Sequence, residues 1–186
     1  MIIGLDFDGT IINWDVLKEK ASSSFLDISL PKNKNMSTAN MVQQSLLTSE
    51  QAELLLSKIF SDRATLEMFE FIPGALEVIQ YFVDKGFEIK IITARPESPH
   101  FHLNDWFANY GFSFEVVYTS RMEKGTYAAD CLAYVDDDYR VLENMTGSLD
   151  NLFLLNQEYN EHEIVTLPIN RVASWSDLKE KILALS

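Results

Sequence analysis

The first ten residues, MIIGLDFDGT, constrain the fold most, because an apolar run ends there in two carboxylates, a glycine and a hydroxyl. A short apolar run of this kind is typical of a parallel strand that is buried on both faces. Asp6 and Asp8 are two residues apart and share one face of a strand, and Gly9 permits a sharp turn beside them. Both carboxylates can therefore approach one cation or one phosphoryl group. A strand followed by an ordinary Asp/Gly turn explains the same residues, so the rest of the chain has to decide.

Composition limits the class of partner. The 186 residues are 47% hydrophobic, enough for a sizeable core, and 15 basic against 28 acidic residues give a formal net charge of −13. This charge opposes binding to long nucleic acids and to anionic membranes. A small anionic substrate still fits, because a metal ion and a few local cations can reverse the field inside a cleft.

The cysteine content and the absence of targeting signals indicate a compartment. Cys131 is the only cysteine, so it has no partner for an internal disulfide, and no Cys/His spacing suggests zinc. We recognise no signal peptide and no apolar run long enough to span a bilayer. The sequence therefore predicts a cytoplasmic protein that is not bound to a membrane, and it indicates no oligomeric state.

A helical insert is expected after the first strand. From residue 14 to residue 70 the apolar residues recur at helical spacing without a convincing strand, which is too long for an ordinary connection. We expect a helix that ends before Pro31, a polar loop over 31–35, a helix from Ser37 through Leu47 and another from Ser49 through Phe60. A further helical pattern covers residues 66–69. The predicted organisation is an α/β core of residues 1–13 and 71–186 with a helical cap of residues 14–70.

Strands and helices alternate from residue 71 onward. Predicted strands at 87–92, 115–118, 132–135 and 152–155 are separated by helical patterns, one of which begins at Ser98. This alternation predicts an α/β fold with a doubly wound parallel sheet, covered by helices on both faces. In such folds ligands bind at the carboxyl ends of the strands, so the residues at those ends are candidates for a site.

Polar residues follow three of the predicted strands. Asp6 and Asp8 follow the first strand, Thr93 ends the second, Asp136 and Asp137 follow the fourth, and Lys124 precedes the fourth. This order resembles the four motifs of the haloacid dehalogenase-like (HAD) hydrolase superfamily, and the resemblance covers the whole α/β core. The helical insert occupies the place of that superfamily's small cap. A lone DxDGT is a weak signal, whereas four motifs in order make a strong one.

The resemblance implies an enzyme, a HAD-type phosphatase. Asp6 would be the nucleophile that forms an aspartyl-phosphate, and Asp8 would be the general acid and then the general base. Lys124 would offset negative charge on the nucleophile and the phosphoryl group. A phosphate-binding set is implied at Thr93, Ala94, Gly9 and Thr10.

The implied cofactor is Mg²⁺, a hard cation that prefers oxygen ligands. Its ligands would come from Asp6, the backbone carbonyl of Asp8, Asp136 and Asp137, with Asp136 and Asp137 not distinguished as direct ligands. We assign Asp138 to capping of the next helix. Each of these residues also has a purely structural interpretation. Thr93 can be a strand-end hydroxyl, Lys124 a solvated loop charge, and the run Asp136 to Asp138 an N-cap of the following helix.

The C-terminal part of the sequence indicates which family within the superfamily the chain resembles. The stretch from Leu152 to Asn160, followed by Asn170-Arg171-Val172 and Trp175, is similar to the tail of the 5′(3′)-deoxyribonucleotidase-like family. Thr10 departs from that family, where Val is common, and the aromatic residues of the insert do not align with its base-binding set. The family implies a small phosphorylated substrate, a nucleoside monophosphate. Two alternatives remain: a phosphatase of sugar phosphates or other small metabolites, and a non-catalytic module that binds phosphate or metal.

Overall fold

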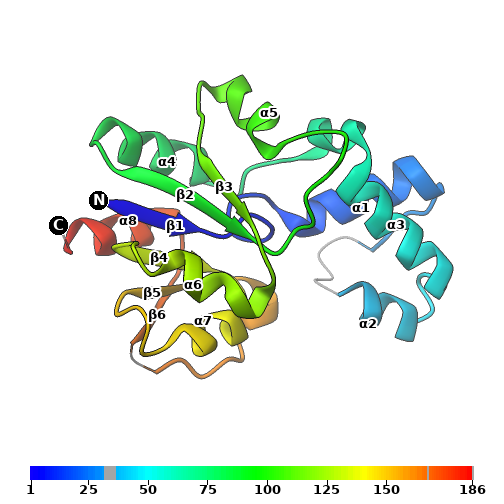
Figure 1. Ribbon diagram of the computed structural model, residues 1–186. Helices are drawn as coiled ribbons and strands as arrows, with labels where there is room; N and C mark the ends of the chain where they lie inside the picture. Colours follow the sequence, from blue (N-terminus) through cyan, green and yellow to red (C-terminus); the bar gives the residue numbers. More distant parts are fainter. Residues whose placement is uncertain (32–36, 167, 186) are drawn as a thin grey trace.

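A six-stranded parallel sheet forms the centre of the protein, in the order β3-β2-β1-β4-β5-β6 (Figure 1). The computed structural model describes residues 1–31, 37–166 and 168–185. The strands are β1 (Ile2–Leu5), β2 (Glu88–Thr93), β3 (Glu115–Tyr118), β4 (Ala133–Asp136), β5 (Leu152–Leu155) and β6 (Ile169–Val172). The predicted fold class is confirmed. The sequence analysis missed β6, whose four residues include two polar ones and lack a long apolar run.

Helices cover both faces of the sheet. Helices α4 (Ala75–Asp84) and α8 (Trp175–Leu183) pack together against one face, and α6 (Lys124–Ala128) and α7 (Tyr139–Met145) pack against the other. Alternate residues of each strand enter the two cores, as the strand period requires. In β4, for example, Ala133 and Val135 belong to the first core and Tyr134 to the second. The chain places β2 and β3 on one side of β1, and β4, β5 and β6 on the other. The strand order therefore reverses between β1 and β4.

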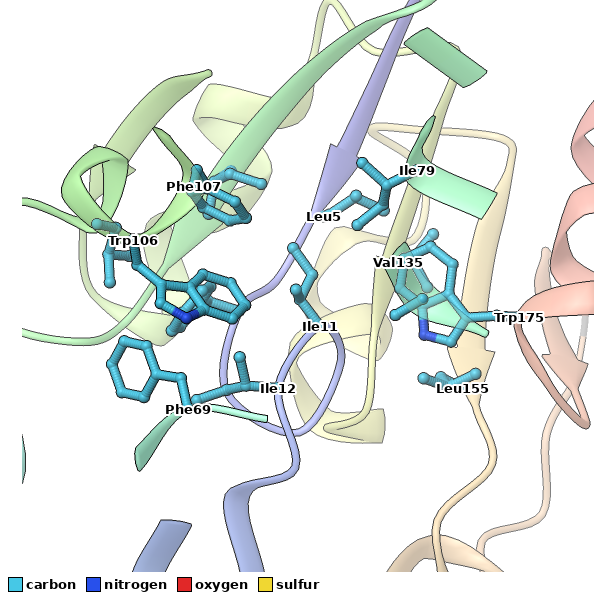
Figure 2. Packing of buried hydrophobic residues seen from close by; sticks show 14 of the residues in the cluster. Leu5, Ile11, Ile12, Phe69, Ile79, Trp106, Phe107, Val135, Leu155 and Trp175 are labelled. Carbon is cyan, nitrogen blue, oxygen red and sulfur yellow. The ribbon is translucent and has the colours of Figure 1, made fainter. Parts of the chain in front are cut away.

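The larger core extends from the sheet to the loop that follows β1. Figure 2 shows Trp106 beside Phe69 and Ile12, and Trp175 close to Val135 and Leu155. Trp106 lies on the short helix α5 (Leu103–Phe107) and is 3% exposed. The indole Nε1 of Trp175 donates a hydrogen bond of 3.1 Å to the backbone oxygen of Thr10. These contacts fix the loop that carries the first acidic residues.

The helical insert consists of α1 (Trp14–Leu26), α2 (Thr38–Gln43), α3 (Ser49–Ser61) and the 3₁₀ segment η1 (Arg63–Met68). It lies beyond the carboxyl ends of the central strands, on the right of Figure 1. Its two connections to the core run side by side, because Ile12 pairs with Phe71 in an antiparallel bridge and Asn13 N–H donates to the Glu70 oxygen at 2.8 Å. Both ends of the insert are therefore joined to the core at one place.

Some expected helix boundaries are right and others are wrong. The helix expected to end before Pro31 does so at Leu26, where Asp27 follows in the left-handed region (φ 56°). Helix α2 begins after Ser37 as predicted but ends at Gln43, and Ser45, also left-handed (φ 58°), follows it. Of the expected loop over residues 31–35, positions 32–35 lie outside the described residues.

The other wrong boundaries lie around η1 and α5. The pattern at residues 66–69 overlaps a 3₁₀ helix that ends at Met68. The helix expected from Ser98 begins only at Leu103. Ser98 instead forms a local turn, in which its Oγ accepts from the His100 N–H at 3.1 Å, and the capping box of His102 and Asp105 starts the helix.

Candidate active site

One lysine joins the ends of two neighbouring strands. Asp6 directly follows β1, and Asp136 is the last residue of β4, which pairs with β1. The Lys124 ammonium, at the start of α6, donates to Asp6 Oδ1 at 2.6 Å and to Asp136 Oδ2 at 2.8 Å. All three side chains are buried. The structure thus brings together three of the four sequence motifs, those of Asp6, Lys124 and Asp136.

Asp137 completes an acidic cluster with the other two carboxylates. One oxygen from each of Asp6, Asp136 and Asp137 lies within 4.8 Å of the others. The Thr10 hydroxyl donates to Asp137 Oδ1 at 3.1 Å, and the Tyr159 hydroxyl donates to Asp137 Oδ2. The side chain of Asp137 is therefore held from two sides, with its oxygens turned toward the cluster.

Burial and like charge raise the pKa of Asp6 and of Asp137. Burial raises the pKa of Asp6 well above its usual range; Lys124 opposes this shift, while Asp136 and Asp137 add to it. Burial and the charge of Asp136 raise the pKa of Asp137 to about 7, although its bonds from Tyr159 and Thr10 act the other way. Burial alone would lower the pKa of Lys124, but Asp136 and Asp6 raise it above its ordinary value. Lys124 is thus a permanent cation at neutral pH.

The cluster suits a divalent cation. Three buried carboxylates share the single ammonium of Lys124, which leaves two negative charges without a counter-charge among these four groups when all are ionised. Uncompensated buried charge is costly, and a hard divalent cation neutralises it with the oxygen ligands it prefers. Asp6, Asp136 and Asp137 can hold such an ion. The side chain of Asp8 is not part of this cluster, and the contribution of its backbone carbonyl to a metal site stays a prediction.

Asp8 instead contacts Arg95, a residue that the sequence analysis did not assign to the site. Arg95 Nη2 and Nε bind the Asp8 carboxylate at 2.5 Å and 3.1 Å, and the Arg95 side chain is 1% exposed. Its backbone N–H donates to the Thr93 hydroxyl at 3.1 Å. The only sequence signal for a role of Arg95 in the site is its position two residues after Thr93. That signal is weak, because an arginine without a role in the site could occupy the same position.

The predicted phosphate-binding residues fall into two groups. Thr93 and Ala94 line a cavity of about 490 Å³ above the acidic cluster. Gly9 and Thr10 have other contacts: the Gly9 N–H donates to the Ile12 oxygen at 3.0 Å, and the Thr10 hydroxyl binds Asp137. These contacts support the loop and Asp137, and the phosphate-binding role of Gly9 and Thr10 stays a prediction. Gly9 has φ +91°, and a Cβ there would lie 2.5 Å from Asp137 Oδ2.

The loop after β5 braces the acidic cluster. Asn160 is 3% exposed, and its amide donates to the backbone oxygens of Asp137 and Leu155 at 2.9 Å and 2.8 Å. Arg171 on β6 holds Asn160 in turn, with Nη1 on the side-chain oxygen at 3.0 Å and Nη2 on the backbone oxygen at 2.8 Å. The Tyr-Asn pair and the Arg-Val segment noted in the sequence thus serve the site through one hydrogen-bonded unit.

The cavity lies between the core and the helical insert. Core residues of the acidic cluster form its floor, and the insert contributes Trp14, Lys18, Ser37, Asn40 and Phe60. Trp14 and Phe60 stack on each other, with ring centroids 6.0 Å apart and an interplanar angle of 11°. Of the aromatic residues near the two ends of the insert, Trp14 reaches the cavity, whereas Phe69 and Phe71 pack against Trp106.

Solved structures that resemble this fold include HAD-superfamily hydrolases. A predicted phosphatase from Clostridium acetobutylicum has TM-score 0.66 at 16% identity and covers 98% of both chains. A HAD family hydrolase from Deinococcus radiodurans, solved with bound phosphate and sodium, has TM-score 0.62 at 11% identity over 99% of this chain and 95% of that one. The chain therefore has the HAD-like fold that its motifs predicted.

Two curated proteins resemble this chain over almost its full length. A Bacillus cereus protein, provisionally named a nucleotidase, is 24% identical over 98% of both chains. A Chlorobaculum tepidum protein, provisionally named a 5′(3′)-deoxyribonucleotidase, is 22% identical over 99% of this chain and 91% of its own. These relatives and the structural neighbours support the predicted enzyme class, a phosphoric monoester hydrolase. A family model described as PITM 1-3, LNS2 domain, matches residues 56–146, a segment without Asp6 and Asp8.

Proposed function

We propose that the protein is a Mg²⁺-dependent phosphomonoesterase that works through an aspartyl-phosphate. The observation that carries this proposal is the buried contact of Lys124 with both Asp6 and Asp136, beside Asp137 and below a cavity lined by Thr93. Phosphoryl transfer needs a positioned nucleophile and neutralisation of charge on the phosphoryl oxygens. Asp6, Asp136 and Asp137 would hold the Mg²⁺, which when bound would neutralise charge on the carboxylates and on the phosphoryl oxygens.

In the first step the Asp6 carboxylate would attack phosphorus in line with the leaving oxygen. The bond from Asp6 to phosphorus forms as the bond from phosphorus to the alcohol oxygen breaks, and Asp8 gives that oxygen a proton. Lys124 keeps Asp6 in place, and the Thr93 hydroxyl with the N–H groups beside it would hold a phosphoryl oxygen. In the second step Asp8 takes a proton from the water that attacks phosphorus and releases Asp6.

The helical insert of residues 14–70 would act as the cap, over a core of residues 1–13 and 71–186. The paired connections at Ile12–Asn13 and Glu70–Phe71 are the natural hinges for cap movement. Closure would exclude water and select the leaving group. A nucleoside monophosphate is the substrate we favour: two curated relatives carry nucleotidase names, and Trp14 offers the cavity an aromatic ring.

The test is phosphate release from a panel of nucleoside monophosphates, deoxynucleotides and sugar phosphates, with Mg²⁺ and with EDTA. Asp6→Asn should lower kcat at least 1,000-fold, since it removes the nucleophile while leaving a residue of the same size. Asp84→Asn is the matched control, because Asp84 is exposed on α4, where its side chain accepts a hydrogen bond of 2.8 Å from exposed Gln80.

The pattern of results decides the proposal. Mg²⁺-dependent release that is lost in Asp6→Asn and kept in Asp84→Asn supports the chemistry, and the ranking of substrates tests the nucleotide preference. Release that persists in Asp6→Asn contradicts the assignment of the nucleophile. No release from folded protein with any member of the panel would contradict the proposed activity on these substrates.

A further inference from the structure

Arg95 connects the proposed acid/base residue to the helical insert. One side of its guanidinium binds the Asp8 carboxylate through Nε and Nη2, and Nη1 donates to the backbone oxygen of Ile59 at 3.1 Å. Ile59 lies in the last turn of α3, the helix of the insert that precedes η1. A single planar group, 3% exposed as a residue, thus spans the gap between the loop after β1 and the insert.

Four aromatic rings surround this guanidinium. The Arg95 Cζ lies 5.5 Å from the ring centroid of Phe7, 5.9 Å from Trp14, 5.0 Å from Phe60 and 5.1 Å from Phe69. Phe7 belongs to the core, and Trp14 and Phe60 belong to helices of the insert. Phe69 lies in the segment that connects the insert to the core. These distances are within the range of cation–π attraction. The side chain therefore has little freedom to turn as long as the insert stays seated against the core.

This arrangement makes the orientation of Asp8 depend on the insert. Movement of α3 away from the core would take with it the Ile59 oxygen and the Phe60 ring, two of the groups that fix the guanidinium. We propose that Arg95 is a positioning residue that sets the Asp8 carboxylate according to whether the insert is seated. The proposal rests on the proposed function, in which Asp8 protonates the leaving group.

Leaving-group dependence separates positioning of Asp8 from a structural role. A sugar alkoxide needs a proton from Asp8 as it leaves, whereas 4-nitrophenolate is stable without one. The value of kcat/KM reports on the step that expels the alcohol and is independent of the later release of phosphate from Asp6. Loss of Asp8 positioning should therefore affect a nucleoside monophosphate much more than 4-nitrophenyl phosphate.

The experiment compares Arg95→Met and Arg95→Lys with the wild type on these two substrates. Arg95→Lys keeps the charge but loses the fork that reaches Asp8 and Ile59 together. For both variants we expect kcat/KM to fall at least 30-fold for the nucleoside monophosphate and less than 3-fold for 4-nitrophenyl phosphate. Arg63→Met is the control, because Arg63 is exposed and forms an exposed ion pair of 3.2 Å with Asp105. Equal losses on the two substrates would overturn the proposal.

Hydrogen exchange tests the connection to the insert without any activity. Both Arg95→Met and Asp8→Asn remove one end of the link, so both should speed amide exchange in the last turn of α3, at residues 59–62, at least 5-fold. Exchange in α7 should stay unchanged and shows that the fold is intact. Unchanged exchange in α3 in either variant would overturn the proposal. If the wild type hydrolyses neither substrate, the proposed function fails, and the exchange result still decides whether Arg95 links Asp8 to α3.

Discussion

At Asp137, hydrogen-bonding groups meet from two loops that lie far apart in the sequence. Thr10 comes from the loop after β1, Tyr159 from the loop after β5, and the amide of Asn160 binds the backbone oxygen of Asp137 itself. Outer groups that orient a metal ligand commonly change metal affinity when they are removed. The role of Asp137 therefore depends on the hydroxyl of Tyr159, which the sequence alone did not connect to it.

We predict that Tyr159→Phe weakens Mg²⁺ binding while the protein stays folded. Loss of an outer hydrogen bond to a metal ligand costs roughly 10–100-fold in affinity. The Mg²⁺ concentration for half-maximal phosphate release should therefore rise by about that factor. Tyr127→Phe is the control, because Tyr127 is exposed and lies outside the cavity. An unchanged Mg²⁺ titration for Tyr159→Phe would contradict the supporting role.

The acidic cluster should make stability in EDTA depend on pH. The pKa of Asp137 is raised from 3.8 to about 7, so the folded protein holds a proton there that the unfolded chain releases. The free energy of unfolding should then fall as the pH rises from about 4 to about 7, with an upper limit of about 4 kcal/mol at about 1.4 kcal/mol per pKa unit. Urea unfolding at several pH values measures this slope.

Asp137→Asn is the matched variant for the pH experiment, because it removes the titrating group and keeps the size of the side chain. It should flatten the decrease in stability between these pH values. Mg²⁺ should stabilise the wild type more at pH 7.5 than at pH 5, since the cation binds the ionised carboxylates. A slope in Asp137→Asn equal to that of the wild type would show that Asp137 does not produce it.

At the level of elements, strand β1 is shaped to let β4 carry a large polar side chain. An ideal Cβ on Gly4 would lie 2.7 Å from Cδ2 of Tyr134, which pairs with Gly4 across the two strands. The buried Tyr134 hydroxyl donates to Asp136 Oδ2 at 3.0 Å and to the Ile92 oxygen at 3.2 Å. Gly4 thus provides the space in which Tyr134 supports a residue of the acidic cluster.

Gly4→Ala should therefore damage both stability and the site. Adding a methyl group to a packed core costs typically about 1–3 kcal/mol, and here it would displace Tyr134 from Asp136. We expect a lower urea midpoint and a reduced kcat. Gly86→Ala serves for comparison: nothing lies within 4 Å of a Cβ at Gly86, so only the strain of its φ of +82° should act there, with no change in kcat. Wild-type kcat in folded Gly4→Ala would contradict the link between Gly4 and the site.

At the level of the whole molecule, the insert and the core share one hydrophobic cluster. Leu17, Leu55 and Ile59 of the insert belong to the same buried cluster as Leu5 and Trp175 of the core. Both ends of the insert also join the core at the bridge between Ile12 and Phe71.

Among the described residues, no helix combines the length and apolar character needed to cross a membrane.

We predict that insert and core unfold together in urea. Trp14 reports on the insert and Trp175 on the core, so variants in which Trp106 is replaced and only one of these two tryptophans is kept separate the two signals. The fluorescence midpoints of the two variants, each compared with its own circular dichroism midpoint, should coincide, as a two-state transition requires. An earlier transition at Trp14 than at Trp175 would show that the insert unfolds independently.

Residue patterns alone predicted the parallel α/β fold and the residues that meet in the acidic cluster. Asp6, Lys124, Asp136 and Asp137 lie at or near strand ends, and apolar runs mark strand ends locally, so their meeting at one edge follows from the parallel arrangement. Helix ends were predicted less well, because left-handed residues such as Asp27 stop a helix without a proline or glycine signal.

Tertiary structure alone decided which residues support that cluster. Arg95 lies 87 positions from Asp8 and Tyr159 lies 22 from Asp137, and their contacts depend on strand order and on loop paths that no local periodicity encodes. Gly9 and Thr10 show the same limit, because the sequence does not reveal that the Gly9 N–H donates to the Ile12 oxygen and the Thr10 hydroxyl to Asp137. Local sequence sets where a strand ends, whereas packing of distant segments sets what each side chain faces.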